Sequence, residues 1–386
     1  MKYAFEGIRV IELGGYIVGS YCGSLLADMG ADVIKFEPLG GDGLRGLLGA
    51  FQGWNRGTRG IAVDLYTEEG KAILHQLALK SDVLVQNLRQ GVAERWGADY
   101  ATLSKINPGM IYCAMPGYGQ SGPDIDKPAF DPLLQALSGA MTAQGGTGNA
   151  PVYYRSAICD YAGAMLGAYG VALALYHRAK TGKGQYLHGA LLNAAIAVQS
   201  GEFIAYFGRH SDDPRMDFWG TSATYRLYKT GDGWIFLGCN DESLWPAICQ
   251  AIGRVELLSD PRFDSSAKRQ ENALQLAQIF DSIFAEGSSQ HWLDRLEESG
   301  IPCAPVNYSR ELFDHPHMHQ NDLIVEHESA DVGKVKQMGL LVKLSKTPGK
   351  LWRGAPGLGQ HTGEILTELG YSQEDVQGLR AKRVIA

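Results

Sequence analysis

The apolar positions at the start of the chain change from a strand-like run to helical spacing and back. Residues 8–13 form a short β-type run that Gly14-Gly15 ends, and residues 18–29 place apolar side chains at helical spacing. Gly30 follows, where glycine commonly ends a helix, and residues 32–37 form the next apolar run. This order predicts a strand, a helix and a parallel strand joined by a right-handed crossover.

The alternation continues through the first half of the chain. Further strands are predicted at residues 60–64, 83–86, 111–115 and 186–188, and further helices at residues 67–79, 131–143, 160–180 and 193–206. Strands that alternate with helices predict the α/β class, here a Rossmann-like domain with an open parallel sheet.

A shift towards polar residues at 208–221 predicts a linker. It separates a large Rossmann-like domain at residues 1–207, which the tail at 330–386 is expected to complete, from a smaller α+β domain at residues 222–329. The smaller domain is expected to contain strands at residues 223–228 and 234–238, joined by a hairpin turn at residues 230–233. Three helices are expected to follow, at residues 242–252, 268–284 and 290–299.

The composition narrows the choice of partners and compartment. A net charge of −7 argues against nucleic acid as the main partner. The six cysteines are scattered without a CxxC pair, which is typical of reduced thiols in a cytoplasmic protein. We find no stretch of 18 uninterrupted apolar residues, so the sequence predicts no membrane span. The 49 glycines indicate many close backbone approaches.

Asp160 stands directly before a long stretch of small and apolar residues, 162–175. A carboxylate at the start of such a helix is stabilised by the unpaired N–H groups of its first turn. Two interpretations follow from the residues alone. Asp160 is either a helix N-cap or a carboxylate held in a dry crevice as a nucleophile.

Two other candidate sites are weaker. The first turn, Gly14 to Gly19, does not have the GxGxxG spacing of dinucleotide sites, so NAD binding is not favoured. His315, His317 and His319 resemble a metal cluster, but a solvated loop is the favoured interpretation because three histidines this close rarely complete a tetrahedral site. We therefore predict no metal and no prosthetic group.

Polar segments at 87–91 and 117–123 follow predicted strands, where parallel sheets bind ligands. Basic residues near them can supply the positive charge that a phosphorylated ligand needs; these are Arg45, Arg89, Arg95 and Lys127.

An ordered set of segments closely resembles the class III coenzyme A transferases, the family that contains formyl-CoA and carnitine CoA-transferases. The matching segments are residues 7–13, 26–38, 55–56, 62–65, 117–123, 129–131, 181–185, 358–362 and 369–371. The resemblance implies that Asp160 is the nucleophile and that the chain forms a homodimer of two interlocked rings. It also implies coenzyme A contacts at Gly15, Tyr16, Ile17, Val18, Asn87, Leu88, Arg95, Trp96 and Lys127.

The resemblance implies transfer of coenzyme A from an acyl-CoA donor to a carboxylic acid through an aspartyl anhydride and an aspartyl-CoA thioester. Two departures concern the ligand. Pro38 replaces an arginine that holds the nucleotide in formyl-CoA transferases, and residues 219–221 replace a glycine run over the active site.

Two alternatives stay open. The α-methylacyl-CoA racemases of the same fold use a histidine where this chain has Phe130, and phenylalanine cannot move a proton, which favours transfer. Because some relatives consist of two subunits, the chain is alternatively a non-catalytic acyl-CoA-binding subunit that pairs with a paralogue.

Overall fold

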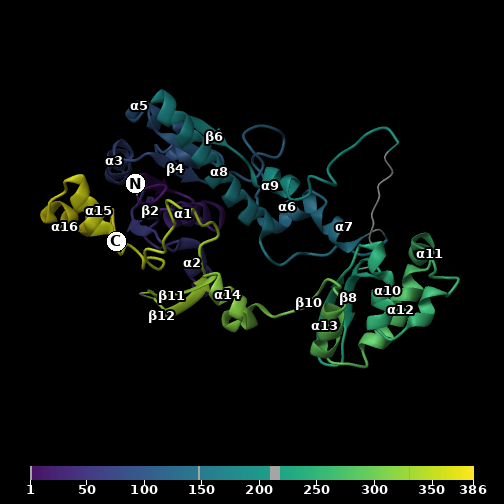
Figure 1. Ribbon diagram of the computed structural model, residues 1–386. Helices are drawn as coiled ribbons and strands as arrows, with labels where there is room; N and C mark the ends of the chain where they lie inside the picture. Colours follow the sequence, from purple (N-terminus) through teal and green to yellow (C-terminus); the bar gives the residue numbers. More distant parts are fainter. Residues whose placement is uncertain (1, 147, 209–217, 330) are drawn as a thin grey trace. The chain divides into compact units, whose positions relative to one another are not determined.

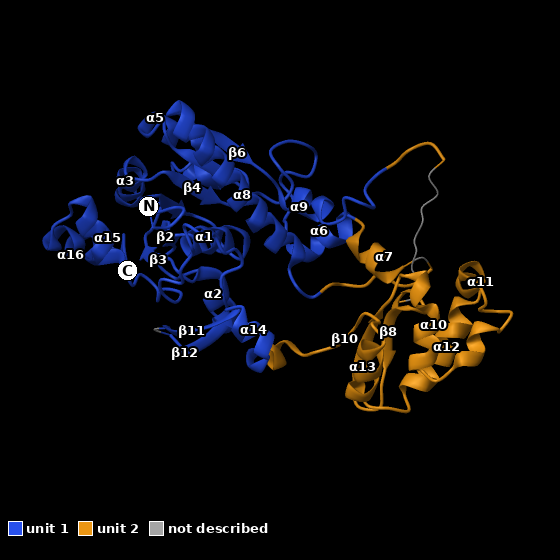
Figure 2. Cartoon of the chain, viewed as in Figure 1, with its two compact units in different colours: residues 1–138, 155–204, 313–386 blue, residues 139–154, 205–312 orange. Residues whose placement is uncertain are grey.

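The structure is a computed structural model that describes residues 2–146, 148–208, 218–329 and 331–386 (Figure 1). The chain forms two compact units (Figure 2). Unit 1 comprises Met1–Ser138, Arg155–Ile204 and Phe313–Ala386, and unit 2 comprises Gly139–Tyr154 and Ala205–Leu312. Residues 209–217 of the predicted linker lie outside the described residues, and the domain boundaries predicted from the sequence stay predictions.

Unit 1 contains a six-stranded parallel sheet in the order β3-β2-β1-β4-β5-β6. Its strands are β1 (Arg9–Glu12), β2 (Asp32–Glu37), β3 (Arg59–Ala62), β4 (Val83–Gln86), β5 (Ile111–Ala114) and β6 (Tyr186–His188). The order reverses between β1 and β4, and this topological switch point is where doubly wound sheets bind ligands. The predicted Rossmann-like parallel sheet is confirmed.

Both faces of this sheet are covered, because alternate strand residues point into two hydrophobic cores. In β1, Val10 belongs to the core that includes α1 (Val18–Asp28) and α8 (Ile158–Thr181). The next residue, Ile11, belongs to the core of α3 (Glu68–Leu79), α5 (Tyr100–Ile106), α15 (Thr362–Leu369) and α16 (Gln373–Ala381). The C-terminal helices therefore pack on the sheet that the N-terminal residues begin.

Small residues let α8 pack closely on the sheet. A Cβ atom added to Gly167 would lie 3.3 Å from Cys22 Sγ of α1 and 3.6 Å from Cys113 Sγ of β5. Among the described residues α8 is the one helix long and apolar enough for a membrane span by length and composition. Its packing against α1 and β5 places one face of it in the core of unit 1.

Three predicted helices differ from the structure. The helix expected at residues 131–143 is divided into α6 (Asp131–Leu137) and α7 (Ala140–Gly145), because Gly139 between them has a φ of +85°. The helix expected at 193–206 is the shorter α9 (Leu191–Ala197), and that at 268–284 is divided into α11 (Ser266–Glu271) and α12 (Ala273–Phe284).

Unit 2 contains an antiparallel sheet with helices, as predicted for the smaller α+β domain. Its strand order is β10-β9-β8-β7, with β7 (Gly220–Ser222), β8 (Tyr225–Lys229), β9 (Trp234–Gly238) and β10 (Cys303–Pro305). Helices α10 (Trp245–Ala251), α12 and α13 (Ser289–Glu298) share its core. The sequence pattern missed β7 and β10, each of which has only three residues.

The remaining elements are short. They are α2 (Leu48–Asn55), α4 (Val92–Arg95), η1 (Glu242–Leu244), η2 (Val255–Leu258), η3 (Ser309–Asp314), α14 (Pro316–Gln320) and the hairpin β11 (Ile324–Ser329) and β12 (Gly333–Met338).

Candidate active site

The turn after β1 is tied to the end of β4 at the switch point of the sheet. Asn87 Oδ1 accepts a hydrogen bond from the Gly15 N–H at 3.0 Å, and Asn87 Nδ2 donates to the Gly15 carbonyl at 2.9 Å. A Cβ atom on Gly14 would lie 2.5 Å from Asn87 Oδ1, so this close approach requires glycine. Two residues predicted to contact coenzyme A, Gly15 and Asn87, are thereby in direct contact with each other.

Tyr16 has a left-handed backbone, with a φ of +62°. This region is unfavourable for a bulky side chain and is commonly found where function requires it. Tyr16 is 51% exposed, and its ring packs edge-to-face on Phe130, with ring centroids 6.0 Å apart. This contact places the first turn beside the start of α6.

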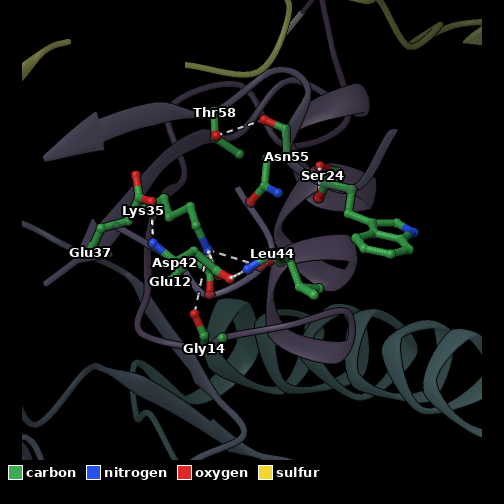
Figure 3. Close-up of polar contacts among 12 residues, drawn as sticks. Glu12, Gly14, Ser24, Lys35, Glu37, Asp42, Leu44, Asn55 and Thr58 are labelled. Carbon is green, nitrogen blue, oxygen red and sulfur yellow. Dashed lines mark hydrogen bonds and ion pairs between the residues drawn. The ribbon is translucent and has the colours of Figure 1, made fainter. Parts of the chain in front are cut away.

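A buried charged cluster contacts the turn through the Gly14 carbonyl (Figure 3). Lys35 Nζ lies 2.9 Å from Glu12 Oε2, 3.2 Å from Asp42 Oδ2 and 3.4 Å from the Gly14 carbonyl oxygen. It also donates to Ser20 Oγ at 2.9 Å. Lys35 and Glu12 are fully buried. Sequence reasoning missed this cluster, although a lysine and a glutamate inside two apolar strands were a visible signal.

The buried charges perturb one another. Burial lowers the pKa of Lys35, but Glu12, Asp42 and Glu37 outweigh burial, so this pKa is raised. Burial raises the pKa of Glu12 to about 7 in spite of Lys35. The ammonium group is therefore held in place by carboxylates, and it anchors the carbonyl of the first turn.

A cavity of about 400 Å³ opens above this turn. Four of the predicted coenzyme A contacts line it, namely Gly15, Tyr16, Leu88 and Trp96, together with Pro38. Trp96 Nε1 is buried and has no hydrogen-bond partner among the described residues. A buried indole N–H without a partner is costly, so Trp96 is an unusual member of the cavity wall.

The cavity wall carries no positive charge among the described residues that line it. Arg45, a candidate phosphate ligand, binds both carboxylate oxygens of Glu37 at 2.7 and 2.6 Å. A phosphate group inside the cavity would therefore meet no cationic side chain among these lining residues.

The other predicted contacts lie in different surroundings. Ile17 and Val18 are buried at the start of α1, and Arg95 is exposed at the end of α4. Lys127 is exposed and forms an ion pair with Asp124.

Asp160 lies inside α8 rather than at its cap. The helix begins at Ile158 with Ala157 as N-cap, so Asp160 is its third residue, and the N-cap interpretation is wrong. The cap comes from α6 instead. Asp131 Oδ2 accepts hydrogen bonds from the N–H groups of Cys159 at 2.7 Å and Asp160 at 3.2 Å.

The surroundings of Asp160 make its carboxylate unusually basic. Burial, followed by the negative charge of Asp131, raises the pKa of Asp160 to about 7. The neighbouring thiol of Cys159 has a pKa of about 12, chiefly because of burial, so it is not a thiolate near neutral pH. Asp160 is thus the better nucleophile of the two.

The helix that carries Asp160 packs against the start of α1. A Cβ atom on Gly163, one turn after Asp160, would lie 3.6 Å from Val18 Cγ1 and 3.1 Å from Leu191 Cδ2. Together with the contact between Tyr16 and Phe130, this packing brings the Asp160 region and the first turn to one side of unit 1.

The described residues contain no group of three or more His, Cys, Asp or Glu side chains arranged to hold a metal ion. Of the candidate histidines, His315 is the N-cap of α14 and its ring accepts a hydrogen bond from the His317 N–H. The absence of a metal or prosthetic group from the reaction stays a prediction.

A doubly wound sheet with a cavity at its switch point and a basic carboxylate at a nearby helix N-terminus defines an α/β enzyme for an extended ligand. The chain matches the family described as CoA-transferase family III over residues 5–362. The chain belongs to this family, and the resemblance seen in the sequence is confirmed.

Relatives match over nearly the whole chain. The succinyl-CoA–D-citramalate CoA-transferase of Chloroflexus aurantiacus is 33% identical and covers 98% of both chains. The human succinyl-CoA:glutarate CoA-transferase is 32% identical over 94% of this chain and 85% of its own. The crystal structure of a CAIB/BAIF family protein from Brucella suis superimposes with a TM-score of 0.87 at 27% identity, covering 96% of this chain and 100% of the other.

The family defines the enzyme class. The chain is a class III CoA-transferase, which moves coenzyme A between an acyl-CoA and a carboxylic acid. Coenzyme A is accordingly part of the substrate.

Proposed function

We propose that Asp160 is the nucleophile of this transfer. The observation that carries the proposal is a partly buried carboxylate, basic for its type, beside the turn at the switch point of the sheet. Carboxylates attack thioesters when water is excluded and the ionised form is close to the substrate.

Each step of the transfer forms one bond to an acyl carbon and breaks another. Asp160 attacks the thioester carbon, forming an aspartyl anhydride and releasing the CoA thiolate with the electron pair of the broken C–S bond. The thiolate then attacks the Asp160 carbonyl carbon, giving an aspartyl-CoA thioester and the donor's free carboxylate. The acceptor carboxylate reverses both steps, and no net proton is consumed.

Trapping tests this assignment. Incubation with the acyl-CoA donor followed by hydroxylamine or borohydride should modify the peptide that contains Asp160. Asp160→Ala should abolish both modification and transfer, while the matched Asp99→Asn, which alters the N-cap of α5, should retain both. Near-normal transfer by Asp160→Ala would show that the nucleophile is another group.

Coenzyme A is proposed to bind along the first turn and the cavity above it. Gly15, Tyr16, Leu88 and Trp96 line this cavity. The proposed contacts further out are Ile17, Val18, Asn87, Arg95 and Lys127. We assign Asn87 to holding the Gly15 backbone, because both of its polar atoms are bonded there.

The donor is proposed to be succinyl-CoA and the acceptor a small dicarboxylic acid. The support comes from relatives whose names state succinyl-CoA with D-citramalate, L-malate or glutarate. A mass-spectrometric screen of succinyl-CoA against these acids should give a new acyl-CoA. Deuterium uptake into a 2-methylacyl-CoA without any acceptor would instead establish the racemase alternative, which Phe130 disfavours.

The chain is further proposed to be a homodimer. One side of α8 exposes five large apolar side chains, between 38% and 63% exposed, which are Met165, Leu166, Tyr169, Leu173 and Tyr176. An apolar stripe of this kind marks an interaction surface. Native mass spectrometry of the purified chain should show a dimer. An inactive monomer would favour the two-subunit alternative, since some relatives are named as subunits.

A further inference from the structure

Asp131 is a second carboxylate at the site, and the transfer chemistry described above leaves it without a role. Its side chain is only 4% exposed. It stands at the first position of α6, but one of its oxygens accepts hydrogen bonds from the N-terminus of a different helix, α8. The cap of α8 is therefore supplied from 28 residues upstream of Cys159.

The contacts of Asp131 fix the main chain that carries the nucleophile. One carboxylate oxygen accepts from the N–H groups of both Cys159 and Asp160, and the other accepts from Gln135 Nε2. These three donors satisfy the oxygens of a buried side chain. The Asp160 carboxylate thus extends from a backbone position that Asp131 holds, with the charge of Asp131 close by.

This juxtaposition has a chemical consequence. Asp160 is anionic before the reaction, but it carries no charge as an anhydride or as a thioester. A neighbouring anion disfavours the anionic form alone. The equilibrium between ionised Asp160 and its covalent forms is therefore shifted towards the covalent forms.

We propose that Asp131 is a positioning residue for Asp160, which holds the first turn of α8 in place and drives the nucleophile towards its uncharged, covalently bound states. This inference rests on the proposed nucleophilic role of Asp160.

Other titratable groups around Asp160 do not supply such a charge. Those on α8 itself are Cys159, Tyr161, Tyr169, Tyr176, His177, Arg178 and Lys180, of which the last three stand more than four turns after Asp160. Those on α1, β5 and β6 are Tyr21, Cys22, Asp28, Tyr112, Cys113, Tyr186 and His188, those in the segment before α8 are Tyr153, Tyr154 and Arg155, and α9 carries none. Burial raises the pKa of the Cys22, Cys113 and Tyr21 side chains, so they are neutral near pH 7. Asp28 is paired with Arg56 at 2.6 Å, His188 stacks on Tyr186, and Arg155 lies in an exposed segment. Asp131 is the charged group that, after burial, raises the pKa of Asp160.

The test is the variant Asp131→Asn, which keeps an oxygen to accept from the α8 N–H groups and removes the charge. The measurement is the single-turnover rate of Asp160 acylation by succinyl-CoA between pH 5 and 9, followed by quenching and peptide mass spectrometry. In the unmodified protein the rate should rise with pH through a midpoint near 7, where Asp160 ionises. In Asp131→Asn the midpoint should fall by about one pH unit, and the covalent fraction at equilibrium should fall about tenfold.

A purely structural cap would leave the midpoint and the covalent fraction unchanged, and that result would overturn the proposal. Asp99→Asn, which removes the charge of another helix cap, should keep the original midpoint. If Asp131→Asn does not fold, the unmodified protein can still overturn the proposal, because an acylation midpoint below pH 5 would show that the charge of Asp131 does not raise the pKa of Asp160. If only the role of Asp131 is wrong, acyl-CoA-dependent labelling of Asp160 is still observed. If Asp160 is not the nucleophile, that labelling is lost.

Discussion

The change Lys35→Met would test whether the buried charged cluster supports the first turn. The side chains of Lys35 and Glu12 are both 0% exposed, and Lys35 Nζ has two carboxylates within 3.2 Å. Methionine preserves most of the volume but leaves Glu12 and Asp42 buried without their cation. Removing one partner of a buried ion pair typically costs about 3–5 kcal/mol.

That loss is a large share of the roughly 5–15 kcal/mol by which a domain is stable. An exposed pair provides the matched control. Lys71 contacts Glu68 at 2.8 Å, but the Glu68 side chain is 86% exposed. Lys71→Met should therefore cost less than about 1 kcal/mol.

The effect of Lys35→Met should depend on pH. Without Lys35, burial raises the pKa of Glu12 further above the value of about 7 that it has in the folded protein. The folded variant then binds a proton that the unfolded chain releases above its ordinary pKa of about 4.3. Stability is retained below that pH and is lost as the pH rises through the folded-state pKa.

Hydrogen exchange measured by mass spectrometry suits a chain of two compact units, because peptides from β1 and β2 report on unit 1 alone. Exchange in these peptides should accelerate strongly in Lys35→Met at pH 7.5 and less at pH 5. The double variant Glu12→Gln/Lys35→Met should recover part of the protection. A cost below about 1 kcal/mol, or equal costs at both pH values, would refute the view that the cluster is a buried, mutually dependent ion network.

Two further changes probe the packing that forms the site. Asn87→Ala removes two hydrogen bonds to Gly15, each worth about 0.5–1.5 kcal/mol. KM for the acyl-CoA should therefore rise at least about fivefold in steady-state assays. An unchanged KM would contradict the role of Asn87 in holding the Gly15 backbone. Gly163→Val directs new methyl groups at Leu191, whose Cδ2 would lie 3.1 Å from the added Cβ; overpacking of about 1–3 kcal/mol should lower the melting temperature by several degrees. The control Gly363→Ala, which meets open space, should not lower it.

Local sequence patterns were sufficient for most of the sheet. The strand at 32–37 and the helix end at Gly30 agree with the structure residue for residue, because strand periodicity and a left-handed glycine are properties of a few adjacent residues. The hairpin turn at 230–233 is another such case, with Thr230 Oγ1 accepting from the Gly233 N–H. The pattern was misleading at residues 131–143, where a single glycine, Gly139, divides a helix whose apolar spacing continues past it, and it also misplaced the bounds of the helices predicted at 193–206 and 268–284.

The sequence by itself therefore determined the class of fold, the family and a single prominent carboxylate, Asp160. Only the tertiary structure decided how that carboxylate is held. Its helix is capped by Asp131, 29 residues away, and Asn87 clamps Gly15 across 72 residues. Helix periodicity and turn preferences extend over a few residues, whereas the partner of an unpaired N–H or a buried charge is chosen by packing between distant segments.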